Sequence, residues 1–326
     1  MPTIPTTRNT TRHGPRLSMS SRPARIRGLR AALLTTTLLV TTACSPKKMA
    51  VNAVADVLSS DSTSSFATDD DLDLVGDATP FALKLMESIL QQTPEHTGLL
   101  QALCSGYTQY ATVWVLRPAE DLKYDDFDGY QAGQTRSHAL FVRARDYGLG
   151  SLELLHPGTM ESLYMDPEGS LSPVTAEQVP LLYWTGAAWL MAVSTSLDDV
   201  ASFGELPIAT AMIRRALELD EDWDRGSLHE VMISLETALP MPGGADRART
   251  HFERAVELSG GLRASPYVSL ASSVSVSDQK RDEFEQLLRT ALEVDIDAHP
   301  PDRLANAYAQ DRARFLVDHI DDLFIE

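Results

Sequence analysis

The chain has 326 residues, with 46 acidic and 28 basic side chains and a formal net charge of −18 at neutral pH. This acidity argues against binding to nucleic acid or to anionic lipid surfaces. Two cysteines exclude a scaffold built on several disulfide bonds, and the length leaves room for a large core or a stack of repeats.

The first 43 residues differ chemically from the rest of the chain. They hold seven arginines and no acidic residue, and they end in the apolar, threonine-rich run Ala31–Ala43. A basic segment, a short apolar segment and a small residue describe a secretory signal, whereas a bilayer span needs about 20 apolar residues. We therefore predict a signal peptide over residues 1–43, with Met19 as an alternative start. Its removal takes seven of the 28 basic residues and leaves 21 against 46 acidic ones, a net charge of about −25.

Cys44 directly follows Ala43, and this arrangement resembles the lipobox of bacterial lipoproteins, although Thr41 stands where that pattern usually has Leu. The resemblance implies that Cys44 becomes a lipid-modified N-terminus, and two or more acyl chains would hold the protein on the bilayer. We expect residues 44–61 to form a lipidated tether on the periplasmic side of the envelope. Ser45 permits outer-membrane sorting by the same resemblance. The alternative is an ordinary signal with a chance cysteine, and Cys104 is expected to be a buried small hydrophobe.

Residues 62–326 are predicted to fold into helices, because apolar residues recur at spacings of three and four and alternating β-branched runs are nearly absent. One small-and-bulky spacing recurs along this region and resembles the second helix of a tetratricopeptide repeat (TPR). A second spacing, of three, one and three residues, recurs between these copies. The first set comprises Ala82–Ile89, Ser137–Ala144, Ala209–Leu219, Ala248–Leu258 and Phe284–Val294, and the second comprises Leu100–Tyr107, Leu182–Trp189, Leu228–Leu235 and Tyr267–Val274.

These repeats predict an all-α fold, a superhelical array of TPR-like antiparallel helix pairs in which each pair contacts its neighbours. Thr68, followed by three aspartates, is predicted to cap a helix, and a metal-binding use of those aspartates is the alternative. The segments Arg117–Gln134 and His156–Pro180 are rich in turn-forming residues and are expected to be loops near the binding surface.

Five short sequence segments, taken together in chain order, resemble the TatT family, the T component of tetratricopeptide-associated TRAP transporters. The resemblance implies a lipoprotein of helical repeats that assembles as a homotrimer and partners a periplasmic TRAP-type solute-binding protein. It also implies a lumen through the helical body that admits an apolar or organic-acid ligand. The five segments are Phe66–Asp71, Ser105–Ala111, Arg143–Leu149, Tyr183–Trp189 and His319–Phe324.

The catalytic and metal-binding motifs that we sought are incomplete in this sequence. His229-Glu230 lacks the second histidine of a zinc-protease helix, and Asp125–Gly129 is out of register for a calcium loop. We therefore predict a protein that is not an enzyme and has no cofactor or metal.

Aromatic residues at helical spacing are the candidate ligand-binding or partner-binding residues. Packing between repeats is the preferred interpretation, because aromatic side chains dominate protein cores. The alternative is that some of them line the concave lumen, with Gln109 as a polar contact. The set is Tyr107, Gln109, Tyr110, Trp114, Tyr183, Trp184 and Trp189.

Three function classes follow. The leading hypothesis is a transport accessory that docks a solute-binding protein and helps to deliver its cargo. The second is a peptide-binding scaffold of the cell envelope that uses TPR-type grooves. The third is an exported enzyme, for which no residue of the sequence is a candidate.

Overall fold

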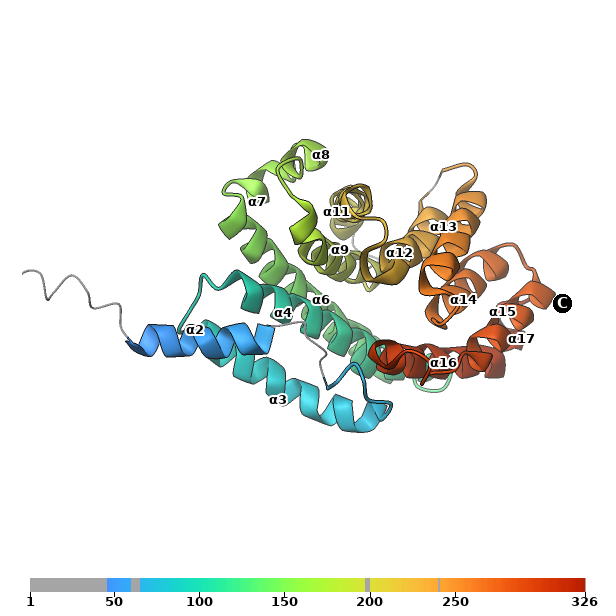
Figure 1. Ribbon diagram of the computed structural model, residues 1–326. Coiled ribbons are helices and arrows are strands. Elements are labelled where there is room, and N and C mark those ends of the chain that lie inside the picture. Colours follow the sequence, from blue (N-terminus) through green and yellow to red (C-terminus); the bar gives the residue numbers. More distant parts are fainter. Residues whose placement is uncertain (1–45, 60–64, 197–199, 240, 326) are drawn as a thin grey trace, which may run out of the picture. The chain divides into compact units, whose positions relative to one another are not determined.

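The computed structural model describes residues 46–59, 65–196, 200–239 and 241–325, so the predicted signal peptide and Cys44 lie outside the described residues (Figure 1). Every regular element in these ranges is helical, which confirms the all-α prediction. None of the helices in them has the length and apolarity needed to cross a bilayer. The longer helices are α2 (Pro46–Ser59), α3 (Leu72–Leu90), α4 (Thr97–Ala111), α6 (Phe127–Leu155), α9 (Val179–Ser194), α11 (Leu206–Leu219), α12 (Ser227–Ala238), α13 (Gly244–Ser259), α15 (Arg281–Glu293) and α16 (Arg303–Asp318).

Short helical segments connect the longer helices. Two of them, η1 and η4, are π-helical turns that continue α4 and α14, and η2, η3 and η5 are turns of 3₁₀ helix. The short segments are η1 (Thr112–Leu116), α5 (Arg117–Asp121), α7 (Thr159–Ser162), α8 (Pro167–Ser170), η2 (Ala176–Gln178), α10 (Val200–Phe203), η3 (Trp223–Gly226), α14 (Ser265–Leu270), η4 (Ala271–Ser275), η5 (Pro300–Asp302) and α17 (Ile320–Leu323).

Consecutive long helices pack against one another along the chain. Helix α6 contacts both α4 and α9, α9 contacts α11, α12 contacts α13, and α15 contacts α16 (Figure 1). Their buried side chains form several separate clusters, each shared by neighbouring helices. This distribution is what repeats too small to bury their own apolar faces require. It is compatible with a TPR-like superhelix, which remains a prediction.

Small residues set the closest helix contacts. A Cβ atom placed on Gly148 of α6 would lie 2.2 Å from Oγ1 of Thr185 on α9. One placed on Gly186 would lie 2.8 Å from Cδ1 of Ile213 on α11. A glycine lets two helix backbones approach where larger side chains would hold them apart. The two glycines therefore fix the spacing on both sides of α9.

Two local predictions were wrong about where helices begin. The side chain of Asp71, and not that of Thr68, caps α3, because Asp71 Oδ1 accepts a hydrogen bond from the Leu74 amide at 2.9 Å. The segment predicted as an acidic loop contains α5 and the first turns of α6. Asp126 caps α6 by accepting the Gly129 amide at 3.0 Å, so the acidic run that resembles a calcium loop is a helix start.

The last long helix contacts the first part of the array. The Arg303 guanidinium donates a hydrogen bond to the Thr68 carbonyl at 3.0 Å, and the Leu304 amide donates to the Ala67 carbonyl at 3.1 Å. Arg117 of α5 forms an ion pair with Asp311 of α16 at 3.2 Å. In an open array each repeat contacts only its neighbours, so these contacts between distant repeats are a departure from the predicted pattern.

A buried ionic network fixes the start of α16 to the turn before α12. Asp302 is 3% exposed and accepts hydrogen bonds from Arg225 at 2.5 Å and from Arg263 at 2.8 Å. Asp224 and Arg225 both have positive φ angles, 45° and 55°, a conformation that is costly for residues other than glycine. Arg263 also binds Asp224, at 3.0 Å. The network therefore holds this turn in its unusual backbone conformation.

Candidate functional site

Tyr107 lies in a polar cluster that joins α3, α4 and α6. The Tyr107 and Tyr147 hydroxyls both donate to Oε1 of Glu87, at 2.7 and 2.8 Å, and their rings stack with centroids 6.0 Å apart. Burial alone would raise the pKa of Glu87, but hydrogen bonds from Lys84 and the two tyrosines outweigh it and lower that pKa. Tyr107 itself is buried. In this structure it ties three helices together.

Trp114 and Tyr110 link α3 to the same region. The π-helical turn after α4 places the Trp114 ring on the Tyr110 ring, with centroids 6.1 Å apart. Trp114 Nε1 donates to the Leu72 carbonyl at 2.8 Å, and a Cβ atom on Gly76 would lie 2.5 Å from that nitrogen. Gln109 is exposed, and its amide donates to the Ser105 carbonyl of its own helix at 3.3 Å.

Tyr183 and Trp184 are half-buried and adjacent at the middle of α9. Their rings meet edge to face with centroids 4.9 Å apart, and Tyr183 also packs on Trp223 at 4.7 Å. Trp184 contacts the cluster that contains Tyr107, whereas Tyr183 contacts the cluster around α9 and α11. Burial raises the pKa of Tyr183 and that of nearby Glu230.

Trp189 belongs to the same core cluster as Tyr183 and to a different cluster from Tyr107, Tyr110 and Trp184. Its ring is fully buried, and its Nε1 donates to Oε2 of Glu205 at 2.7 Å. The guanidinium of Arg145 lies 5.1 Å from the ring centroid and also binds Glu205, at 3.3 Å. The structure therefore brings Tyr107, Tyr110 and Trp184 into one cluster and places Trp189 and Tyr183 in another, around α9 and α11.

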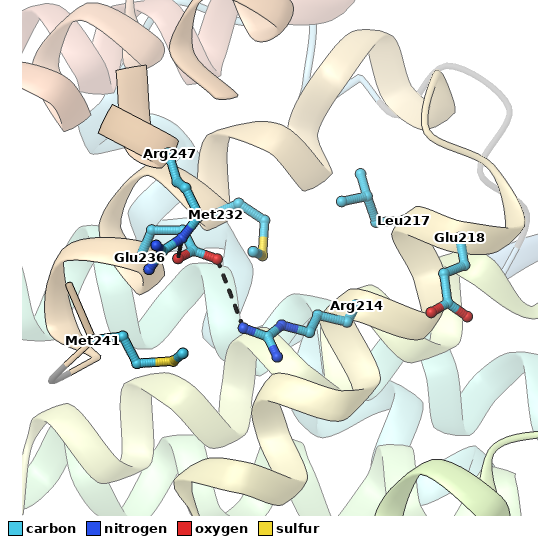
Figure 2. Close-up of a pocket in the computed structure, with 7 residues that line it drawn as sticks. All are labelled: Arg214, Leu217, Glu218, Met232, Glu236, Met241 and Arg247. Atoms are coloured by element: carbon cyan, nitrogen blue, oxygen red, sulfur yellow. Dashed lines mark hydrogen bonds and ion pairs between the residues drawn. The ribbon is translucent and has the colours of Figure 1, made fainter. Parts of the chain in front are cut away.

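A pocket that the sequence analysis did not identify lies between α11, α12 and α13, and we call it the α11–α13 pocket. It has a volume of about 320 Å³. Figure 2 shows Arg214 and Arg247 pointing toward Glu236 from two sides. Glu236 is 4% exposed and is hydrogen-bonded by Arg247 Nε, whereas Arg214 lies 3.7 Å away. The lining residues are Arg214, Leu217, Glu218, Met232, Glu236, Met241 and Arg247.

A histidine pair joins α12 to α13 beside this pocket. The Nδ1 atoms of His229 and His251 lie 2.8 Å apart, so one ring must donate a proton and the other must accept it. Burial lowers the pKa of both imidazoles. Neither histidine belongs to a larger ligand set, because no group of three metal-binding side chains occurs among the described residues.

The sequence carried only part of the signal for these residues. Met232 and Glu236 are four residues apart and so share a face of the predicted α12. A glutamate is ordinarily exposed, however, and nothing in the sequence indicated that Glu236 is buried. The aromatic cluster offers ring faces and hydroxyl groups, and the α11–α13 pocket offers two guanidinium groups.

Comparison with known proteins gives the family. The chain matches the family described as the TRAP transporter T-component over residues 68–324. It is also similar to a protein of Treponema pallidum (strain Nichols) described as uncharacterized, with 28% identity over 307 residues that cover 88% of this chain and 95% of the relative. The family match begins at the turn before α3 and ends just after α17. It confirms the family resemblance that the five sequence segments indicated. Because the matched range spans most of the chain, the protein belongs to the TRAP transporter T-component family.

Proposed function

We propose that this protein is the accessory component of a TRAP-type transport system that docks a periplasmic solute-binding protein and passes an organic-acid or apolar ligand. Membership of the T-component family is the observation that carries the proposal. That membership ties the chain to a transport system, and the docking and the ligand transfer are our extension of it. No enzymatic step is included in this function.

The aromatic residues of α4 and α9 support the ligand-passing part. Tyr110, Tyr183 and Trp184 are half-buried rather than sealed in the core. Aromatic rings with a polar edge suit a surface that is apolar on one side and wet on the other. We propose that Tyr183 and Trp184 contact the passing ligand and that Tyr107, Trp114 and Trp189 hold the helices that present them.

The membrane and assembly parts of the proposal follow from the sequence and the family resemblance. Cys44 would carry the lipid anchor on the periplasmic side, in the outer membrane, and the assembled form would be a homotrimer. A Cys44→Ser variant is expected to move the protein from the membrane fraction to the soluble fraction. A variant that stays in the membrane fraction would contradict lipid attachment at Cys44.

Co-purification from the native envelope tests the docking. A C-terminally tagged chain is isolated and the captured proteins are identified by mass spectrometry, with an untagged strain as the control. The expected result is enrichment of a TRAP-type solute-binding protein. Enrichment of other envelope proteins without it would favour the peptide-binding scaffold and would overturn the docking proposal.

The Trp184→Ala variant tests the role of the aromatic residues. Because Trp184 is half-buried, we expect weaker capture of the partner or the ligand and an unchanged helical circular dichroism spectrum. Trp189→Ala is the matched control on the same helix, because removal of its fully buried ring predicts a large loss of stability instead. A large loss of helical signal in the Trp184 variant would assign that residue to the core alone.

A further inference from the structure

We propose that the α11–α13 pocket binds a small monocarboxylate with an apolar tail. The pocket lies between α11, α12 and α13, and it contains none of the seven candidate ligand-binding or partner-binding residues of the sequence analysis. The inference deepens the ligand-passing part of the proposed function and rests on it for its place in transport. Binding of the ligand to the pocket can be measured on the isolated protein, without the rest of the transport system.

The charges of the pocket leave one positive charge without a close partner. Arg214 and Arg247 face one carboxylate, that of Glu236, so the three groups together carry a charge of +1. Arg247 donates to Glu236 and to the Pro242 carbonyl, and its Nη2 has no acceptor. Within the described residues Arg214 makes only the 3.7 Å contact with Glu236 and no hydrogen bond. Its side chain is 46% exposed, so its guanidinium is accessible to a ligand.

A carboxylate is the anion that fits this arrangement. A guanidinium binds a carboxylate through two parallel hydrogen bonds, which are roughly twice as strong as bonds between neutral groups. Arg214 makes no hydrogen bond within the described residues, so its exposed guanidinium is available for such a pair. Binding of one carboxylate would also balance the excess charge of the Arg214, Glu236 and Arg247 group.

The remaining walls select for an apolar tail. Leu217, Met232 and Met241 line the pocket, and methionine side chains adapt to ligands of different shape. The volume of about 320 Å³ is at the lower end of the range for small-molecule sites. The pocket therefore suits a tail of a few carbon atoms and is too small for a peptide segment.

A second negative charge on the ligand is disfavoured. Glu218 lines the pocket on the side away from the Arg247–Glu236 pair (Figure 2). Its carboxylate is 67% exposed and pairs with Arg215 at 3.2 Å. A second anionic group on the ligand would therefore meet a carboxylate on this side of the pocket and not a free cation. The chain as a whole has a net charge of −18, which also repels multivalent anions. A monoanion is thus preferred over a dicarboxylate.

Isothermal titration of the purified full-length protein tests the proposal. The probes are hexanoate, hexanol with the same tail and no charge, acetate with the charge and almost no tail, and butanedioate. We expect hexanoate to bind and each of the other three to bind at least about tenfold more weakly. Arg214→Gln should weaken hexanoate binding about tenfold, the effect of losing one charge-assisted pair. Arg289→Gln on α15, an exposed arginine outside the pocket, should leave it unchanged.

Three results would overturn the inference. They are no hexanoate binding by the wild-type protein, equal binding of hexanoate and hexanol, and equal weakening by the Arg214 and Arg289 variants. Circular dichroism of both variants shows whether the fold is retained, which is expected because both side chains are exposed. If hexanoate does not bind but a solute-binding protein is captured from the envelope, the pocket proposal fails and the proposed function stands. Hexanoate binding without that capture leaves the pocket standing.

Discussion

The Asp302→Asn variant is the sharpest test of the ionic network that holds the start of α16. Asparagine keeps the size of the side chain and one acceptor oxygen, but it removes the charge and replaces the second acceptor oxygen by an NH2 donor. Asp302 is 3% exposed, and the Arg263 side chain beside it is 10% exposed. Burial alone would lower the pKa of Arg263, but the hydrogen bonds and charges of Asp302 and Asp224 outweigh it and raise that pKa. Arginine is not deprotonated in proteins, so Arg263 stays charged in the variant.

Breaking a buried ion pair costs about 3–5 kcal/mol. Because Arg263 keeps Asp224 as a partner in the variant, we expect a loss of unfolding free energy at the lower end of that range, about 3 kcal/mol. Asp297→Asn is the matched control, because Asp297 is 68% exposed and pairs with Arg303 at 2.6 Å in the same segment of the chain. An exposed pair contributes below about 1 kcal/mol. Urea unfolding followed by circular dichroism compares the two variants. Equal losses in the two would refute the reasoning that burial makes the Asp302 network strong.

Three further predictions concern single contacts and use the same unfolding measurement. Because burial lowers the pKa of His229 and His251, their contribution to stability is present above the unfolded-state pKa of about 6.5 and is lost as the pH falls from there through the folded values. The wild-type protein should therefore lose more stability between pH 7.5 and pH 5.5 than a variant with asparagine at both positions, and an equal loss would exclude the pair as the cause. Gly186→Ala should cost about 1–3 kcal/mol, because the new Cβ would lie 2.8 Å from Ile213 Cδ1; an unchanged stability would show that α11 shifts freely. Trp189→Ala should cost about 3–5 kcal/mol, as expected for a fully buried ring, and a loss below about 1 kcal/mol would contradict that burial.

The helical content of the fold was predictable because it depends on local periodicity. The nine segments with repeated spacing lie in helices apart from Val294, which follows α15 directly. Helix starts were less predictable, because an acidic residue such as Asp126 has several local uses. Its side chain caps α6, although the acidic run around it was interpreted as part of a loop. Only the backbone geometry distinguishes these uses.

The candidate site was predictable only where neighbouring residues on one helix form it. Tyr183 and Trp184 are adjacent in sequence and in contact. The α11–α13 pocket combines Arg214 and Arg247 from different helices around Glu236. Their meeting depends on how three helices cross, which no spacing within one helix specifies. The contact of Arg303 with Thr68, 235 residues away, is outside the reach of any local pattern for the same reason.

The contact between α16 and the segment before α3 has a consequence for how the chain matures. In synthesis from the N-terminus, α16 emerges long after the segment before α3, so the carbonyls of Ala67 and Thr68 must wait for donors that lie at least 235 residues further along the chain. Closing so long a loop adds only about 0.6 kcal/mol per doubling of its length, but contacts so distant in sequence slow folding. A nascent or truncated chain without α16 would thus have folded early helices, while the Ala67 and Thr68 carbonyls before α3 would lack the donors that α16 supplies. The native state would form only when α16 docks on the segment before α3, and the completion of any single repeat would not be enough.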